Sequence, residues 1–362
     1  GDSGRQTSDL FRETAKHSDD LTFIHSMHTE GVAHGPATLF LHCGSTSFIR
    51  PSLGSWVTYG LGTENENLPA FISLAPLSSS GGARNYGSAF LPAANQGIAI
   101  GKDGKFDANA TIRNLGNTDL SKKEQLRQLQ FLQRLNAEQL KGANQDSELE
   151  ALISSYELAW RMQNNAPGVL DLSQETPGTR AMYGIGEKET DNFGRQCLMA
   201  RRLCEKGVRF VQVTSGSAGG ANNWDQHSKL PLHEPQAKAV DKPIAGLLQD
   251  LKQRGLLEDT IVWFSGEFGR APYAQNNGTG RDHNAGGFTT WLAGNCLKSG
   301  FTYGSTDEFG HKAVENKVHM HDLHATLLYL LGLDHEQLTY RYAGLDFRLT
   351  NIHGNVVKDI LA

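Results

Sequence analysis

A helix followed by an apolar strand occurs twice between residues 191 and 265, and this alternation constrains the fold more than any other feature. The segment DNFGRQCLMARRLCEKG has helical spacing and a glycine stop, and VRFVQVT follows it as a β-branched strand. HEPQAKAVDKPIAGLLQDLKQRG and DTIVWFS repeat the pattern, and GFTTWLAG is a third apolar run. Continuous apolar runs fit parallel strands that helices cover on both faces. We therefore predict an α/β fold with a mostly parallel sheet, in which these runs are neighbouring strands.

The rest of the chain adds a strand, further helices and an insertion to this core. DLTFIHSMH reads as a strand after a helical stretch at residues 8–17, and HGPATLFLHCGS reads as a turn that runs into a helix. Leucines recur at helical spacing on both sides of a polar break within residues 121–162, which predicts a helical hairpin. We expect one α/β domain over residues 1–362, with residues 106–165 as a helical insertion within it.

Composition limits the classes of partner. The 34 basic and 39 acidic residues give a formal net charge of -5 without a long run of one sign, so we expect neither a nucleic-acid nor a polybasic membrane surface. The four cysteines are too few and too scattered for a disulfide scaffold or a structural zinc site. No apolar stretch approaches the roughly 20 residues of a membrane span. Small molecules or other proteins are the expected partners.

Acidic and basic side chains gather where the predicted strands end or begin. In open parallel sheets, sites form beyond the carboxyl ends of the strands. Such side chains follow two of the apolar runs and precede the third: Asp225, His227, Glu267, Arg270, Arg281, Asp282 and His283. Each one alone reads equally as a turn residue or a helix cap. Such groups occur beside all three predicted strands, and their side chains supply ligands for Zn²⁺, Mn²⁺ or similar ions. We therefore predict a metal site.

Other histidines allow two interpretations each. His321 and His324 are three residues apart, as on a shared helix face, yet they pack in a core as readily as they ligate. Asp322 beside them is expected to cap the following helix. His34 lies at a strand-to-helix turn, where it faces either the predicted site or the core. At the site it would donate a proton or contact an anion.

Several segments resemble known proteins. VHMHDLHATLLYLLGL resembles the sulfatase signature V-S-x-V-D-L-x-P-T-L-L-D-L-A-G, and IVWFSGEFG resembles the sulfatase strand that ends in S-D-N-G or S-D-H-G. HGPATLFLHCG has the Pro-to-Gly spacing of the sulfatase motif C-x-P-S-R-x-x-x-L-T-G. The run RDHNAGGFTTWLAGNCLKSGFTYGSTDEFG looks closer still to the bacterial DUF1501 proteins, an uncharacterised family of the alkaline phosphatase and sulfatase superfamily. Resemblance to that family extends over nearly the whole chain.

The resemblance implies a sulfatase/alkaline-phosphatase-like fold and metal-dependent hydrolysis of a sulfate or phosphate ester. The substrate would be a small anionic ester, and the cofactor a divalent metal such as Zn, Mn or Ca. We expect the metal ligands to be Asp225, His227, Glu267 and His283, with Asp282 as a further ligand or as an orienter of an imidazole. Arg270 and Arg281 would hold the anionic group. Export to the periplasm is expected from the family alone.

Departures from the sulfatase pattern bear on activity. His34 stands at the position of the modified Cys or Ser and Thr38 at that of the Arg, so formylglycine chemistry is excluded. Phe268 cannot ligate a metal, and the Asp-x-His spacing of Asp225 and His227 is shorter than that of alkaline-phosphatase relatives. DUF1501 proteins usually carry a G-G-x-S-x-x-D type motif on a first strand, and this chain starts downstream of it. We therefore expect little or no arylsulfatase turnover.

Two rival functions remain open. A carboxylesterase or phosphodiesterase would use the same cleft, although the chain contains no G-x-S-x-G elbow. The other rival is a binding protein that has the fold but no catalytic activity. Phe268, which cannot ligate a metal, and the start of the chain downstream of the first-strand motif both favour this alternative. Metal analysis and turnover of sulfate, phosphate and acyl esters separate the three.

Overall fold

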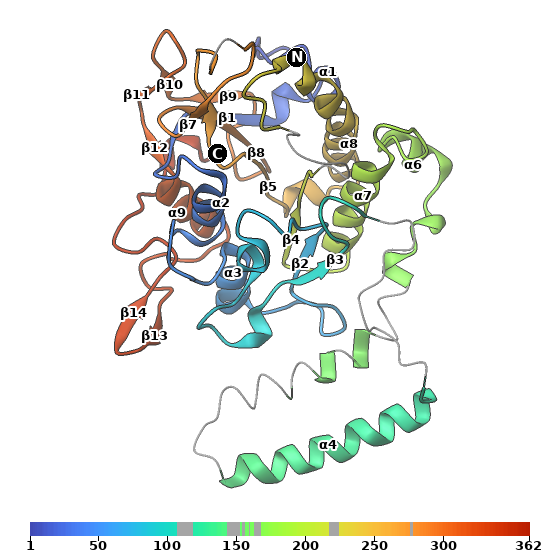
Figure 1. Cartoon of the computed structure of the whole chain (residues 1–362). Helices are drawn as coiled ribbons and strands as arrows, with labels where there is room; N and C mark the ends of the chain where they lie inside the picture. The colour runs from blue at the N-terminus through green and yellow to red at the C-terminus, as the bar shows by residue number, and fades with distance from the viewer. Residues whose placement is uncertain are drawn as a thin grey trace.

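The computed structural model describes residues 1–106, 119–142, 153, 156–158, 160–162, 168–216, 224–275 and 278–362. It is a mixed α/β fold (Figure 1). Its helices are α1 (Arg12–Ala15), α2 (His34–Cys43), α3 (Leu53–Leu61), α4 (Lys122–Gly142), α6 (Pro177–Met182), α7 (Asp191–Glu205), α8 (His233–Gln253) and α9 (Met320–Leu330). No helix in these ranges has the length and apolar character that crossing a membrane requires.

The larger sheet has five strands in the order β12-β1-β8-β5, with β9 also paired to β1. These strands are β1 (Leu21–His28), β5 (Val262–Phe264), β8 (Phe288–Ala293), β9 (Phe301–Tyr303) and β12 (Val318–His319). β1 contributes buried apolar side chains to both of its faces, and each face packs on helices. Ile24 and Met27 lie in the core with side chains of α2, α3 and α9, whereas Leu21 and Phe23 pack with side chains of α8.

A smaller parallel sheet has the order β3-β2-β4. It consists of β2 (Phe71–Leu74), β3 (Ile98–Ile100) and β4 (Phe210–Val213). Helix α7 packs beside it and contributes buried residues such as Leu198 and Met199 to a second core. Short two-stranded pairs complete the strands: β6 (Gly269–Arg270) with β7 (His283–Asn284), β10 (Ser305–Thr306) with β11 (Ala313–Glu315), and β13 (Tyr340–Tyr342) with β14 (Leu345–Phe347).

The predicted strands form, but their pairing differs from the prediction. β4 lies in the smaller sheet, away from β5 and β8, so the three apolar runs are not neighbours in one sheet. β5 and β8 are neighbours, yet they are antiparallel, and the larger sheet is mixed rather than mostly parallel. The chain between β5 and β8 folds into the β6-β7 pair instead of a crossover helix. A parallel pair needs a crossover, so this connection favours the antiparallel arrangement.

The predicted helices are mostly present. Helix α9 matches the segment DLHATLLYLLG, but it begins at Met320, and its N-cap is His319 rather than Asp322. Asp322 still completes the cap, because its carboxylate accepts a hydrogen bond from the His319 N–H. Helix α4 forms the first arm of the predicted hairpin and is drawn apart from the sheets in Figure 1. Much of the second arm lies outside the described residues, and the insertion bounds 106–165 stay a prediction.

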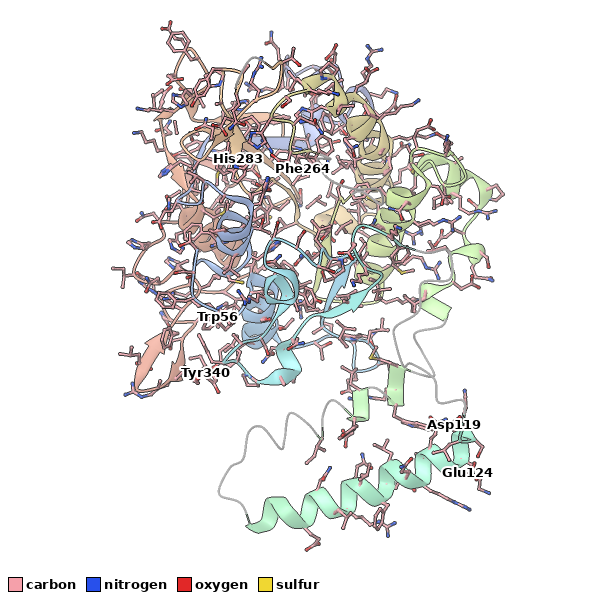
Figure 2. The ribbon with its side chains drawn as sticks, viewed as in Figure 1. Trp56, Asp119, Glu124, Phe264, His283 and Tyr340 are labelled. Carbon is pink, nitrogen blue, oxygen red and sulfur yellow. The ribbon has the colours of Figure 1, made fainter. Side chains whose placement is uncertain are left out.

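Aromatic side chains pack at both ends of the part of the chain that carries the sheets. Trp56 of α3 and Tyr340 of β13 both pack edge-to-face against Tyr59, and they lie toward the lower left of this part, above α4, in Figure 2. Phe264, the last residue of β5, stacks on Trp291 at the upper end, where His283 is also labelled. Asp225 and His227, which contact His283, belong to this upper end.

His324 of α9 makes the stability of the fold sensitive to pH. The residue is fully buried, and its Nε2–H donates to the Leu41 carbonyl at 2.9 Å, while its Nδ1 is buried without a hydrogen-bond partner. Burial lowers the pKa of His324 to about 4. A histidine whose pKa falls on folding contributes full stability above its unfolded pKa of about 6.5, and loses it as the pH falls toward the folded value.

We expect the His324→Gln variant to lose this dependence, since glutamine retains an N–H donor for Leu41 and does not titrate. Between pH 6.5 and 5 the free energy of unfolding of the native chain should fall by about 2 kcal/mol more than that of the variant. Urea unfolding at both pH values measures the difference. Equal losses in the two proteins would show that His324 accepts a proton without cost in the folded state.

Candidate metal centre

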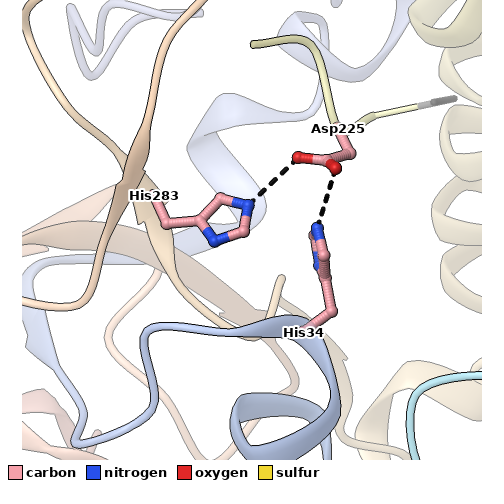
Figure 3. Close-up of side chains that lie close together, drawn as sticks. All are labelled: His34, Asp225 and His283. Carbon is pink, nitrogen blue, oxygen red and sulfur yellow. Dashed lines mark hydrogen bonds and ion pairs between the residues drawn. The ribbon is translucent and has the colours of Figure 1, made fainter. Parts of the chain in front are cut away.

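Three polypeptide segments carry the candidate site. His34 is the first residue of α2, Asp225 and His227 belong to the segment after β4, and His283 is the first residue of β7. Figure 3 shows His34 and His283 on either side of the Asp225 carboxylate. Glu267 and Phe268 lie between β5 and β6, where Glu267 contacts His34 and the Phe268 ring packs against both imidazoles.

Backbone hydrogen bonds fix the Asp225 segment against the β6-β7 pair. The Arg281 N–H donates to the Gln226 carbonyl at 2.9 Å, and the Thr279 N–H donates to the Ser228 carbonyl at 3.0 Å. Gly280 permits this approach, because a Cβ there would lie 2.1 Å from the carbonyl carbon of His227. Asp225 and His227 therefore reach His283 through strand-like pairing of two loops.

Donor atoms of His34, Asp225 and His283 converge. Nε2 of His34 lies 3.1 Å from Asp225 Oδ2, and Nε2 of His283 lies 3.1 Å from Asp225 Oδ1. One ligand atom from each of the three residues lies within 4.8 Å of the others. Bonds of about 2.0–2.2 Å to a tetrahedral Zn²⁺ place neighbouring donors roughly 3.3–3.6 Å apart. The two 3.1 Å separations are a few tenths of an ångström shorter, so binding of an ion would move these side chains only slightly apart.

The outward nitrogens of both imidazoles are occupied by acceptors. Nδ1 of His34 lies 2.6 Å from Glu267 Oε1, and Nδ1 of His283 lies 2.7 Å from the Val32 carbonyl oxygen. Because a carboxylate and a carbonyl accept hydrogen bonds, each Nδ1 carries the hydrogen, and a neutral ring then presents a lone pair at Nε2. Histidines that ligate metals are held in this way.

The surroundings of His34 Nε2, the nitrogen that faces Asp225, favour a cation at the site. Nε2 of His34 is buried and has no hydrogen bond of acceptable geometry, although Asp225 is 3.1 Å away. The hydrogen bond to Glu267, opposed by burial, raises the pKa of His34 above its ordinary value. A positive charge between the two carboxylates is thus favourable, whether a proton or a metal ion supplies it. The donor set fits a divalent ion.

The carboxylates of Asp225 and Glu267 remain ionised because neighbouring side chains favour their charged forms. Burial opposes ionisation of Asp225, but the nearby polar groups of His283, Arg270 and His34 lower its pKa well below the ordinary value. Burial likewise opposes ionisation of Glu267, and the His34 hydrogen bond lowers its pKa. Both side chains are therefore negatively charged at neutral pH.

His227 plays a different part from the other two imidazoles. Its Nε2 lies 2.9 Å from Asp225 Oδ1 and 3.1 Å from His283 Nε2. Both of those atoms are acceptors, because Nδ1 of His283 already carries that ring's hydrogen, so Nε2 of His227 must carry its own. Its Nδ1 is buried without a hydrogen-bond partner, and Asp282 Oδ1 is 3.6 Å away. His227 thus holds a proton beside the metal donors.

Phe268 and Arg270 contact the side chains of the candidate site, whereas Arg281 does not. The Phe268 ring packs 4.3 Å from the His283 ring and 5.3 Å from the His34 ring, which fixes both imidazoles from behind. Nη2 of Arg270 lies 2.8 Å from Asp225 Oδ1. Nη1 of Arg281 instead donates to the carbonyls of Thr279 and Gly280 at 2.8 and 2.9 Å, so this side chain supports its own loop.

The structure places the predicted residues in one region but in unequal roles. Asp225 contacts His34, His227, Arg270 and His283, and Glu267 joins this group through His34. The Asp282 carboxylate accepts a hydrogen bond from the His283 N–H at 2.8 Å and faces His227. Sequence reasoning missed the Val32 carbonyl, because a backbone acceptor has no sequence signal. The buried His321 and His324 belong to α9 and pack against each other.

Glu267→Gln should weaken metal binding without abolishing it. The carboxylate holds the Nδ1 hydrogen of His34, and loss of such an acceptor typically costs 10–100-fold in metal affinity. Glutamine keeps a carbonyl acceptor but removes the charge, so we expect a loss of about tenfold, measured by calorimetric titration with Zn²⁺. A loss as complete as that caused by removing an imidazole would make Glu267 a direct ligand.

Comparisons with known proteins identify a family but no activity. None of the curated proteins matches the chain. Among solved structures, the chain is similar to one titled "Crystal structure of Ps i-CgsB in complex with k-i-k-neocarrahexaose", with 11% identity and a TM-score of 0.43 over 90% of this chain and 67% of that one. A family model described as "Protein of unknown function (DUF1501)" matches residues 1–361. The chain therefore belongs to the DUF1501 family.

Proposed function

We propose that the chain is a metal-dependent hydrolase of small sulfate or phosphate esters. The observation that carries the proposal is the convergence of His34 Nε2, the Asp225 carboxylate and His283 Nε2, each imidazole being oriented by an acceptor on its outer nitrogen. A divalent ion held by these donors would polarise an oxygen of the anionic ester and offset its charge. Two imidazoles and one carboxylate favour Zn²⁺ or Mn²⁺ over Ca²⁺, which prefers oxygen ligands.

We divide the residues of the site into metal ligands, residues that hold the ligands in place, and one proton donor. We assign His34, Asp225 and His283 as ligands, Glu267 as the residue that orients His34, and Asp282 as support for the His283 backbone. His227 is assigned as the proton donor, since its Nε2–H lies beside the donor atoms and its side chain is 29% exposed. This assignment removes His227, Glu267 and Asp282 from the ligands expected from the sequence and adds His34 to them.

The reaction requires one proton at the leaving oxygen. Water would attack the sulfur or phosphorus atom, the bond between that atom and the ester oxygen would break, and His227, in its imidazolium form, would donate the Nε2 proton to the departing oxygen. The attacking water would then return a proton to His227, so that the net reaction consumes one water per ester. A proton donor of this kind contributes typically 10²–10⁴-fold in rate.

Turnover assays on matched substrates test the proposal. Protein freed of metal by a chelator and reloaded with Zn²⁺ or Mn²⁺ would be assayed with p-nitrophenyl sulfate, p-nitrophenyl phosphate, bis(p-nitrophenyl) phosphate and p-nitrophenyl acetate. We expect metal-dependent turnover that His283→Ala abolishes, and we expect it on the phosphate monoester rather than on the aryl sulfate, because little or no arylsulfatase turnover is expected from the sequence. Hydrolysis of only the diester or the acyl ester would identify one of the rival enzymes, and metal binding without any turnover would favour a binding protein.

A further inference from the structure

Arg270 is held against the metal donors rather than extended into solvent. Its Nη2 lies 2.8 Å from Asp225 Oδ1 and 3.4 Å from the Trp224 carbonyl, and its Nη1 lies 3.3 Å from the Arg281 carbonyl. The guanidinium carbon is 5.7 Å from the centre of the Phe268 ring. The side chain is 22% exposed. These contacts fix the charge of Arg270 on the same carboxylate that the site offers to a cation.

Oxygen Oδ1 of Asp225 is crowded. Besides Arg270 it contacts His227 Nε2 at 2.9 Å and His283 Nε2 at 3.1 Å. A carboxylate oxygen offers about two lone pairs, and Arg270 and His227 already direct hydrogens at this one. An ion that shares Oδ1 with His283 must therefore weaken or displace the hydrogen bond from Arg270. The other oxygen, Oδ2, faces His34.

We propose that Arg270 competes with the divalent ion for Asp225 and thereby sets the affinity of the site. The inference rests on the metal site of the proposed function and adds a regulatory role for one residue of it. Arg270 supplies a positive charge to the carboxylate, and a divalent ion supplies a second one at nearly the same place. Like charges a few ångströms apart in a half-buried site repel strongly enough to change a dissociation constant by an order of magnitude or more.

The alternative role of Arg270 makes the opposite prediction. If Arg270 only oriented Asp225 as a ligand, removing it would loosen the carboxylate and weaken metal binding, as loss of other supporting partners does. If it competes with the ion, removing it leaves Asp225 uncompensated and strengthens metal binding. The sign of the change in affinity therefore separates the two roles.

The test is calorimetric titration of the full chain with Zn²⁺ alone, in the absence of any ester. For Arg270→Gln we expect a dissociation constant at least ~10-fold lower than that of the native chain, and for Arg270→Lys, which keeps the charge, a value near the native one. Arg281→Gln removes the same charge from the same hairpin, where the side chain contacts backbone carbonyls instead of Asp225. That control should change the constant by less than about threefold.

Each outcome decides the proposal. Tighter binding by Arg270→Gln supports it, including the case in which only the variant binds measurably. Equal or weaker binding by Arg270→Gln overturns it, and if native turnover depends on metal in the same preparation, the proposed function stands while the competition is rejected. Failure of both proteins to bind Zn²⁺ overturns the competition and the metal site together. Absence of hydrolysis alongside tighter binding rejects only the hydrolase.

Discussion

Replacing Asp225 by asparagine is expected to lower the affinity for Zn²⁺ by at least ~100-fold, because loss of a ligand should exceed the 10–100-fold cost of losing a supporting partner. Both oxygens of this carboxylate face imidazole donors, Oδ2 toward His34 and Oδ1 toward His283. Asparagine is nearly isosteric, but it replaces an ionised oxygen with an N–H₂ group that offers no lone pair. Calorimetric titration with Zn²⁺ measures the loss, and metal-dependent ester turnover should disappear with it.

Asp282→Asn is the matched control for this experiment. The Asp282 carboxylate accepts the His283 N–H at 2.8 Å, a contact that the asparagine carbonyl reproduces. Its affinity for Zn²⁺ should stay within roughly tenfold of the native value, the lower range for a supporting residue. Retained affinity in Asp225→Asn, with a thermal midpoint equal to that of the native chain, would mean that the ion binds elsewhere.

Replacing Arg201 by methionine is expected to destabilise the fold by about 3–5 kcal/mol, the usual cost of breaking a buried ion pair from one side. Arg201 is 1% exposed, and its guanidinium contacts Glu175 at 2.8 Å, Glu205 at 2.7 Å and Asp250 at 2.9 Å. Removal of the cation leaves the Glu175, Glu205 and Asp250 carboxylates to share Arg202 and Arg254, which contact Glu175 at 2.6 Å and Asp250 at 2.7 Å. Urea unfolding at neutral pH measures the change in the free energy of unfolding.

Arg195 on the same helix provides the comparison. It pairs with Asp191 at 2.8 Å, where both side chains are partly exposed, so Arg195→Met should cost less than about 1 kcal/mol. A similar cost for both substitutions would mean that the buried network contributes no more than a surface pair. A larger cost for Arg195 would locate the important charge at the start of α7.

Local sequence pattern predicted the elements better than their partners. The apolar spacing of α9 and the β-branched run of β4 depend on nearby residues, and both elements form. The choice of partner for β4 depends on β2 and β3, more than 100 residues earlier in the chain, and no local pattern contains it. Likewise β5 and β8 pair antiparallel because of the loop between them.

The candidate site was predictable in its residues but not in its construction. Glu267 contacts His34 rather than Asp225 or His283, so it reaches the site through that imidazole. Asp225 and His283 do approach each other, as their placement beside the strands indicated. They meet through the pairing of residues 226–228 with 279–281 and not at the edge of one parallel sheet. Which nitrogen of each imidazole faces inward depends on Glu267 and on the Val32 carbonyl, so the division into ligands and supporting groups required the structure.

Diffraction from crystals grown with Zn²⁺, recorded on both sides of the zinc absorption edge, tests directly whether His34, Asp225 and His283 hold a metal ion. We predict one strong anomalous peak per chain, within about 2.0–2.3 Å of His34 Nε2, an Asp225 oxygen and His283 Nε2. Zinc seated instead among the histidines of α9, or no peak at a saturating zinc concentration, would contradict it.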